Sequence, residues 1–410
     1  MPTTDYTEFL HNVKQEYITN SYELDGTFIF DIELPVTPHI CLKCGETTTR
    51  IKDYRIRTVK FGKVQRGPLI GKYRQRRYIC PHCGHSFAES NTFIRKHMQL
   101  SVTNIRMIFD KLTESLTYTA IANECDTSIT TVLRYCSMIT IPKPKTLPTV
   151  IGIDEFKGNA EGHQYQVNLT NPDTHEILDI LPKRDTQALI RYFASFKHKD
   201  RLQVKFIVMD MSIQFKRIME ALFPHAHIIC NRYHVCRLVD WAVERVRKHE
   251  QHKLASHSRM LKQNRRVLMK HPDHLTEVEH VKLCEILRVS DDLRKAYALK
   301  LSFRKIFSTY GKQGIAAHLT HWLELVKASG LKEFNNFFTS FPAWMTQLTN
   351  AFLLPYSNGY TEGTNNKIKV LKRISYGLRR FDRFRVRILL LSKKNGTNHT
   401  YDWCQRRLVG

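Results

Sequence analysis

Two pairs of cysteines set the strongest constraint on how the N-terminal part of this chain can fold. Cys41 and Cys44 form one Cys-x-x-Cys sequence, and Cys80 and Cys83 form a second. Each pair can place two thiolates on one tetrahedral metal ion, so two pairs separated by a loop predict a four-cysteine zinc ribbon. A redox pair or unrelated cysteines are the alternative interpretation. We therefore expect a structural zinc ion within residues 41–97.

The net charge of the chain narrows the classes of function that it can have. The 410 residues include 64 Lys plus Arg against 38 Asp plus Glu, a formal net charge of +26. Such an excess indicates a polyanionic partner, most often nucleic acid, although a cationic enzyme without a nucleic-acid role is the alternative. The excess is uneven, because residues 1–40 contain one Lys and seven acidic residues, whereas residues 41–100 contain 14 Lys plus Arg and three acidic residues. Residues 361–410 form a second basic block, with 13 Lys plus Arg.

Glycines and alternating side chains around the cysteines support the ribbon. Gly45 and Gly84 each follow a cysteine pair and supply the backbone freedom that a tight turn needs. Residues 50–78 alternate basic and apolar side chains, which predicts strands with one basic face. We expect Arg74 and Arg76 on these strands to contact DNA. Three nearby histidines remain possible replacement ligands: His39, His82 and His85.

Residues 98–140 have the apolar spacing of three short helices, with a turn near Asp126. This pattern is typical of a helix-turn-helix DNA-binding domain, although a three-helix bundle that binds nothing is the alternative. Ser101 fits as the N-cap of the first helix. We expect the last helix to expose polar and basic side chains to DNA: Thr130, Thr131, Arg134 and Tyr135.

Strands and helices alternate after a proline-rich linker at residues 141–148. The order strand-strand-strand-helix-strand-helix-strand is that of an RNase H-like α/β core. Asp154 and Asp210 each end a hydrophobic strand, where a carboxylate can meet ligands at the edge of a sheet. The first and fourth strands are neighbours in this architecture, so we expect the two carboxylates to lie close together. Glu155 is the alternative to Asp154, which ends the hydrophobic alternation better.

A helical, basic segment follows this part of the core and is interpreted as an insertion. Its tryptophans, Trp241, Trp322 and Trp344, are interpreted as core residues, with stacking on a displaced base as the alternative. The core returns with a turn that becomes a helix near Glu362. A carboxylate beside phosphate-binding groups suits a metal-dependent site, because carboxylates hold hard divalent cations. Three such groups follow on the same helix face: Asn366, Lys369 and Arg373.

In combination, these motifs resemble the DDE transposases of bacterial insertion sequences, specifically the ISL3 family. The resemblance spans nearly the whole chain and rests on the ribbon, the helix-turn-helix, the two acid-bearing strands and the turn-helix block. It implies that Asp154, Asp210 and Glu362 form an acidic triad that holds two Mg²⁺ or Mn²⁺ ions. It also implies phosphoryl transfer by two metals, in which one ion activates the nucleophile and the other stabilises the leaving oxygen.

The resemblance implies partners as well. These are double-stranded DNA, both as terminal inverted repeats and as target, and a second copy of the chain in a homodimer or larger synaptic complex. We expect a cytoplasmic, nucleoid-associated bacterial protein without membrane contact, since no apolar run is long enough to span a bilayer. A Cys/Asp-x-x-His pattern often seen in related transposases is replaced here by Asn231 to His234. Position 231 is therefore left without an assigned role, and His234 is interpreted either as an accessory residue of the site or as a core residue.

Two other classes of function remain open. One is a transposase-derived DNA-binding regulator without catalysis, and the other is an RNase H-like nuclease or resolvase. The predicted fold class is multidomain α/β plus α. Its parts are an acidic segment (1–40), a zinc ribbon (41–97), a helix-turn-helix (98–140), a linker (141–148), the first part of the core (149–234), a helical insertion (235–355), the last part of the core (356–395) and a tail (396–410).

Overall fold

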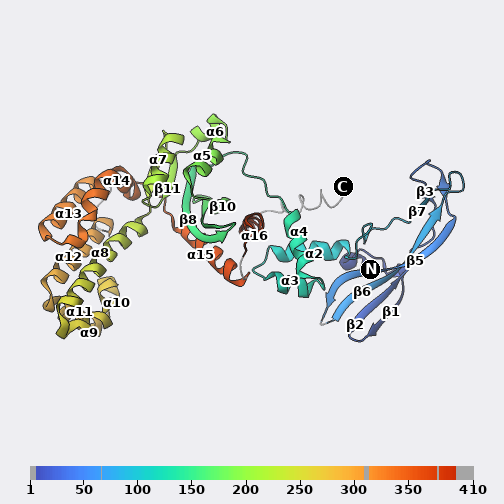
Figure 1. Cartoon of the computed structure of the whole chain (residues 1–410), viewed down its shortest axis with the longest axis horizontal. Coiled ribbons are helices and arrows are strands. Elements are labelled where there is room, and N and C mark those ends of the chain that lie inside the picture. The colour runs from blue at the N-terminus through green and yellow to red at the C-terminus, as the bar shows by residue number, and fades with distance from the viewer. Residues whose placement is uncertain (1–5, 66, 309–313, 376–377, 394–410) are drawn as a thin grey trace, which may run out of the picture. The chain divides into compact units, whose positions relative to one another are not determined.

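The computed structural model describes residues 6–65, 67–308, 314–375 and 378–393 (Figure 1). The chain divides into two compact units: a first unit of Met1–Pro142 with Ile368–Gly410, and a second unit of Lys143–Lys367. The second unit is thus inserted into the sequence of the first. The predicted tail at 396–410 lies outside the described residues. Within the described ranges, we find no helix long and apolar enough to cross a membrane.

A mixed sheet begins the first unit. Its strands lie in the order β1-β2-β6-β5, and β7 pairs with β6. β2 belongs to the predicted acidic segment but pairs in parallel with β6, so the change of charge near Cys41 does not coincide with an edge of the sheet. β5 and β6, which lie in the segment predicted to form strands, pair with each other in antiparallel orientation. The elements are α1 (Tyr6–His11), η1 (Gln15–Tyr17), β1 (Ile18–Leu24), β2 (Thr27–Ile32), β5 (Ile51–Val64), β6 (Gly67–Ile79) and β7 (Ser86–Ala88).

The two cysteine pairs lie in matching turns, the first of which connects β3 (His39–Ile40) to β4 (Thr47–Thr48). Gly45 donates its backbone N–H to the carbonyl of Cys41 at 2.9 Å, and Gly84 donates in the same way to Cys80 at 3.0 Å. Both glycines have positive φ, 77° and 68°. This conformation strains residues with a side chain, so the predicted reason for glycine at both positions is confirmed.

Three helices follow, as predicted: α2 (Val102–Leu112), α3 (Tyr118–Glu124) and α4 (Ile129–Met138). Ser101 caps α2 by accepting the backbone N–H of Asn104, also as predicted. The turn between α3 and α4 contains Asp126 with a positive φ of 45°. The apolar side chains buried in these helices include Ile105, Ile108, Leu112, Ile121, Ala122, Val132 and Cys136.

Helix α16 (Phe381–Lys393) was predicted to belong to the core with Glu362, but it packs on α2 and α4 in the first unit. Its Arg387 is fully buried and donates hydrogen bonds to the carbonyls of Leu112, Glu114 and Leu116. These carbonyls lie at and just beyond the end of α2, where no later N–H of the helix can reach them. A helix from the end of the chain therefore completes the three-helix region.

The sheet of the second unit has the order β10-β9-β8-β11-β12. β9 is antiparallel to β8 and β10, whereas β8, β11 and β12 are parallel to one another. β8 and β11 are therefore neighbours, as predicted. The elements are β8 (Val150–Ala160), β9 (His163–Asn171), β10 (Glu176–Leu181), α5 (Thr186–Ala194), α6 (His198–Leu202), β11 (Phe206–Met209), α7 (Ile213–Leu222) and β12 (His227–Cys230).

Strand register sets one row of polar residues at the end of β11. Met209, the last residue of β11, pairs with the residue before Asp154 on β8 and with the residue before Asn231 on β12. Asp154, Asp210 and Asn231 therefore follow at the same level of the sheet. β8 continues to Ala160, so the prediction that Asp154 ends its strand is wrong. At this level of the sheet, the neighbouring β11 has ended, whereas β8 continues.

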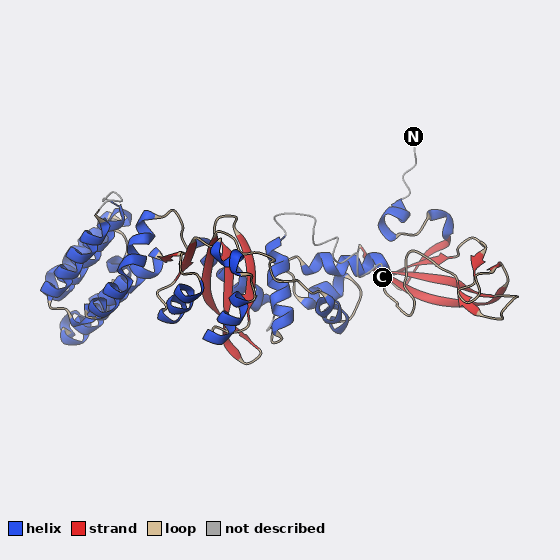
Figure 2. Cartoon of the chain, turned by 90° about the horizontal axis from the view of Figure 1, so that it is seen from above, coloured by secondary structure: helices blue, strands red, loops and turns tan. Residues whose placement is uncertain are grey.

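The inserted segment is helical, as Figure 2 shows, and its apolar side chains join those of the sheet in one hydrophobic core. The chain then returns to the sheet with α15 (Gly359–Ile374), which carries Glu362 in its first turn. The inserted elements are α8 (Arg232–Lys253), η2 (Ala255–His257), α9 (Ser258–Gln263), α10 (Arg265–Met269), η3 (Pro272–His274), α11 (Glu277–Val289), α12 (Asp291–Ser308), α13 (Ile315–Ser329), η4 (Lys332–Phe334) and α14 (Asn336–Leu353).

Replacing Arg387 with Met should loosen the helical part of the first unit. The substitution leaves three carbonyls without their charged donor, a loss of about 3 kcal/mol in local stability. Hydrogen–deuterium exchange of the α2 and α16 amides measures this loss directly. Arg379→Ala, at an exposed position just before α16, is the matched control and should exchange like the wild type. Equal protection in both variants would contradict the role given to Arg387.

Candidate active site and metal centre

The three predicted carboxylates come together at the end of β11. The Asn231 side chain joins two of them, because its Nδ2 donates to Asp210 Oδ1 at 2.9 Å and to Glu362 Oε1 at 2.5 Å. Asn231 also caps α8, since its Oδ1 accepts the backbone N–H of Tyr233 at 3.1 Å. One amide group therefore places Asp210 and Glu362 within a few ångströms of each other.

The third carboxylate, Asp154, is held by two donors. Its Oδ2 accepts from Asn365 Nδ2 on α15 at 2.8 Å, and its Oδ1 accepts from the backbone N–H of Glu155 at 2.7 Å. Glu155 itself pairs with Arg184 at 2.7 Å. The structure thus separates the two adjacent acids, because Asp154 contacts the helix that carries Glu362 and Glu155 binds an exposed guanidinium.

The electrostatics of the site differ from one acid to the next. Burial, followed by the charge of Asp210, raises the pKa of Asp154 to about 7, and the charge of Glu362 acts in the same direction. Burial also disfavours the charged form of Asp210, but the hydrogen bond and charge of His234 outweigh it and lower the pKa of Asp210. Negative charge at Asp154 is therefore poorly compensated by the protein.

His234 lies beside Asp210, with its Nδ1 3.2 Å from Asp210 Oδ2. The same Nδ1 lies 3.0 Å from Arg237 Nη2. When Nδ1 carries a proton it can donate to Asp210 and favour the charged form of that carboxylate. The histidine that the sequence left between core and site therefore contacts a carboxylate of the site.

The donors at this site fit a hard divalent cation. Asp154, Asp210 and Glu362 offer carboxylate oxygens, the ligands that Mg²⁺ and Mn²⁺ prefer. Burial and the charges of Asp210 and Glu362 raise the pKa of Asp154, so the charged form of Asp154 is disfavoured in the metal-free protein. A cation bound among them would supply the missing charge. The three acids are less tightly gathered than the cysteines, which form the one group in the described part of the chain whose ligand atoms all lie within 4.8 Å of one another.

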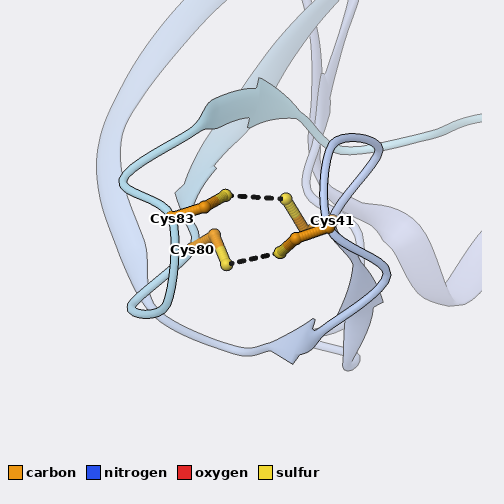
Figure 3. Close-up of side chains that lie close together, drawn as sticks. Cys41, Cys80 and Cys83 are labelled. Carbon is orange, nitrogen blue, oxygen red and sulfur yellow. Dashed lines mark hydrogen bonds between the residues drawn. The ribbon is translucent and has the colours of Figure 1, made fainter.

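The four predicted cysteines form this tighter cluster (Figure 3). The Sγ atoms of Cys41 and Cys83 are 3.6 Å apart, and those of Cys44 and Cys80 are 3.5 Å apart. Thiolates on one tetrahedral zinc ion are separated by about 3.8 Å, given a Zn–S bond of about 2.3 Å. The cluster therefore fits a zinc ion that all four cysteines bind. His39, one of the possible replacement ligands, stacks on the ring of Tyr78 instead.

Two of the predicted DNA contacts are wrong, because the side chains are buried. Arg76 is 4% exposed and is held by Glu33 at 2.6 Å and Glu89 at 3.4 Å. Tyr135 is 3% exposed and lies near Met98, with its hydroxyl 3.9 Å from the Met98 sulfur. The periodicity of residue types predicts which face of a strand or helix a side chain occupies. It does not predict that a neighbouring segment covers that face, as happens at these two positions.

The other predicted DNA contacts lie at the surface. On α4, Thr130 and Arg134 are exposed and Thr131 is half-buried. Arg74 is exposed on β6, where its guanidinium stacks on Tyr54 at 4.0 Å and pairs with Glu33 at 3.2 Å. The α15 side chains are also exposed: Asn366, Lys369 and Arg373.

Two asparagines of the site were missed by the sequence reasoning. Position 231 was left without a role, and Asn366 was chosen on α15 although its neighbour Asn365 contacts Asp154. The tryptophans divide as well: Trp322 and Trp344 are buried, as interpreted, whereas Trp241 is 46% exposed. Trp241 lies under the guanidinium of Arg237, with 4.8 Å between Cζ and the ring centre.

The acidic site lies within a segment of the chain that matches a known protein family. Residues 151–388 match the family of ISL3 DDE transposases. The match covers more than half of the chain and includes all three acids, so the chain belongs to this family.

Individual relatives agree with the family match. The transposase for insertion sequence element IS1001 of Bordetella parapertussis is 22% identical over 363 residues, which cover 85% of this chain and 87% of that protein. The transposase for IS1557 of Mycobacterium tuberculosis is 26% identical over 256 residues, 56% of each chain. A protein of Lactococcus lactis named an ATP-dependent protease is 33% identical, but over 117 residues that cover 28% of this chain. Similarity over most of the chain is therefore to insertion-sequence transposases.

The pH dependence of stability should reveal the crowding at Asp154. In metal-free protein the pKa of Asp154 is about 7, whereas an unfolded aspartate has a pKa of about 3.9. Proton uptake by the folded state then stabilises it as the pH falls below about 7. Relative to Asp154→Asn, wild-type protein in EDTA should gain about 1–3 kcal/mol between pH 7.5 and pH 5. Denaturant unfolding of both proteins at the two pH values measures this difference. An equal change in the free energy of unfolding for wild type and Asp154→Asn would contradict the prediction.

Replacing Cys80 with Ser should abolish zinc binding, since a tetrahedral site loses one of its four thiolates. Metal analysis of purified protein should give about one zinc per wild-type chain and far less in the variant. The variant should also unfold locally around both cysteine turns, which amide exchange can follow. Cys284→Ser, at an exposed cysteine on α11, is the control and should keep its zinc. Full zinc content in the Cys80 variant would refute the assignment.

Proposed function

We propose that this protein is an active DDE transposase that binds the terminal inverted repeats of an insertion sequence and catalyses metal-dependent DNA cleavage and strand transfer. The observation that carries the proposal is the meeting of three acids from separate segments, two of them joined by Asn231. A DNA-binding regulator without catalysis would have no need of crowded, half-buried acids, which cost stability.

The arrangement of the second unit supports an RNase H-like catalytic core. Its strand order, with β8 between the antiparallel β9 and the parallel β11, is the order expected of that architecture. Asp154 and Asp210 lie at one level of the sheet because of the register of β8 with β11. Glu362 joins them from α15 after the long helical insertion.

We assign Asp154, Asp210 and Glu362 to holding a pair of divalent cations, with Mg²⁺ as the physiological ion and Mn²⁺ as a substitute. Such cations supply activation of the attacking hydroxyl and stabilisation of the leaving oxygen when bound. His234 favours the charged form of Asp210, and Asn231 keeps Asp210 and Glu362 facing each other. The protein thus positions the carboxylate oxygens and favours the charged form of Asp210. The proposed reaction needs no covalent protein–DNA intermediate.

DNA contacts are assigned to exposed polar and basic side chains in both units. In the first unit, α4 offers a helix for the major groove, and the zinc-bound turns stabilise the adjoining strands. In the second unit, the exposed Trp241 packs against the half-buried Arg237 on the helix that Asn231 caps. The assigned side chains are Thr130, Thr131, Arg134, Arg74, Asn366, Lys369 and Arg373.

We also propose that the protein acts as a homodimer or larger assembly on DNA. Strand transfer joins two element ends to one target, so two active sites must be held on the same complex. The surplus of basic residues favours such an assembly on a polyanion, with affinity that falls as salt rises.

Replacing Asp154, Asp210 or Glu362 with Ala should lower the rate of cleavage at the element ends by at least about 1,000-fold, because each substitution removes a ligand for the cations. Binding of labelled inverted-repeat DNA should be unchanged. Glu155→Ala is the matched control, since Glu155 is adjacent to Asp154 but pairs with Arg184, and it should cleave within a few-fold of wild type.

Three results would count against the proposal. Undiminished cleavage by Asp210→Ala would remove the triad from the mechanism. Wild-type binding of the ends without any cleavage in Mg²⁺ or Mn²⁺ would favour the regulator. Cleavage of structured DNA that lacks the repeats would favour a nuclease or resolvase.

A further inference from the structure

The face of α15 that is buried in the second unit is polar. Thr361, Thr364 and Asn365 are all buried there, although their side chains carry hydrogen-bonding groups. The residues opposite them on β9, Asn168 and Thr170, are fully buried as well. Buried polar groups need partners, so this face is positioned by hydrogen bonds as well as by packing.

These partners pair directly between helix and sheet. The hydroxyl groups of Thr170 and Thr361 are 2.8 Å apart. Asn168 Nδ2 donates to Thr364 Oγ1 at 2.7 Å and to Asn365 Oδ1 at 2.9 Å. β8 makes room for this contact with Gly152, where a Cβ atom would lie 2.4 Å from the Thr170 hydroxyl and 2.6 Å from the Thr361 hydroxyl.

The same hydrogen bonds fix which way the Asn365 amide faces. Because Asn365 Oδ1 accepts from Asn168, its Nδ2 must point to the other side, where it donates to Asp154 Oδ2 at 2.8 Å. Asp154 and Asn168 are also cross-strand partners in the register of β8 with β9. Asn168, Asn365 and Asp154 therefore form one hydrogen-bonded relay.

We propose that Asn365, oriented by Asn168, is a positioning residue that holds the Asp154 carboxylate in the conformation that binds a divalent cation. This rests on the proposed function of Asp154. The carboxylate is repelled by Asp210 and Glu362, so without the amide it would rotate away from them. Groups that orient metal ligands in this way typically change metal affinity by about 10- to 100-fold.

The first test measures metal binding without catalysis. Mn²⁺ is titrated calorimetrically into the metal-free, full-length protein and into Asn365→Ala and Asn168→Ala. Asn365→Ala should bind Mn²⁺ at least about tenfold more weakly. Asn168→Ala should shift affinity in the same direction by less, because Asn365 keeps its amide but loses the group that orients it. Asn365→Gln, which keeps an amide donor, should recover part of the loss.

The matched control is Gln166→Ala. Gln166 is a fully buried amide two residues from Asn168 on β9, but its Nε2 donates to backbone carbonyls, those of Ala160, His163 and Pro182. Its loss should lower thermal stability while leaving Mn²⁺ affinity unchanged. An equal loss of Mn²⁺ affinity in the Gln166 and Asn365 variants would reduce Asn365 to a structural role and overturn the inference.

The second test separates this inference from the proposed function. In end cleavage, Asn365→Ala should raise the Mg²⁺ concentration for half-maximal rate about tenfold, with the rate largely restored at saturating Mg²⁺. A wild-type Mg²⁺ requirement in Asn365→Ala, together with an inactive Asp154→Ala, would overturn the inference and leave the proposed function intact. Full cleavage by Asp154→Ala would overturn the proposed function itself.

Discussion

Mutual repulsion of three carboxylates is the constraint on which the structure of the second unit depends. Without a cation, Asp154, Asp210 and Glu362 repel one another, so the fold has to hold them close together. Strand register fixes the first two, because β8 and β11 pair up to the residue before each acid. Glu362 arrives on a helix, whose position depends on its contacts with β9 and on the amide of Asn231. The backbone thus works against the electrostatics of its own side chains.

Amides are well suited to hold such a site. An amide N–H compensates part of a carboxylate's charge but carries no formal charge, so the three acids keep a net negative charge for cations to neutralise. A lysine in place of Asn231 or Asn365 would form a permanent ion pair and compete with the metal. Asn231 serves two acids with one nitrogen, and Asn365 serves the third. Replacement of the Cys/Asp of related transposases by Asn at position 231 therefore adds a donor where those residues would add an acceptor or a thiol.

Local patterns in the sequence predicted the elements well, because their causes are local. Cysteine spacing, glycine turns, helix caps and runs of apolar residues depend on neighbours within a few positions, and the strands of the second unit lie where these patterns place them. The predictions are wrong where a segment that is distant in sequence determines the surroundings of a residue. Arg76 is covered by Glu33 and Glu89, and α16 completes a helical region that precedes it by more than 200 residues. No periodicity within α16 indicates which unit its buried Arg387 serves.

The choice between Asn365 and Asn366 shows the limit of helical periodicity at the site. Both follow Glu362 by about one turn, on opposite sides of its direction, and a helical wheel alone cannot tell which side meets the sheet. The answer lies in β9, where the buried Asn168 donates a hydrogen bond to Oδ1 of Asn365. This polar contact has a cost, since within the described residues Asn168 Oδ1 finds no hydrogen-bond partner. Apolar side chains would pack there without that cost, but they would let the helix rotate or slide. Directional hydrogen bonds prevent such movement of the helix. A carboxylate that binds a cation must be placed to within tenths of an ångström, so it depends on this restraint.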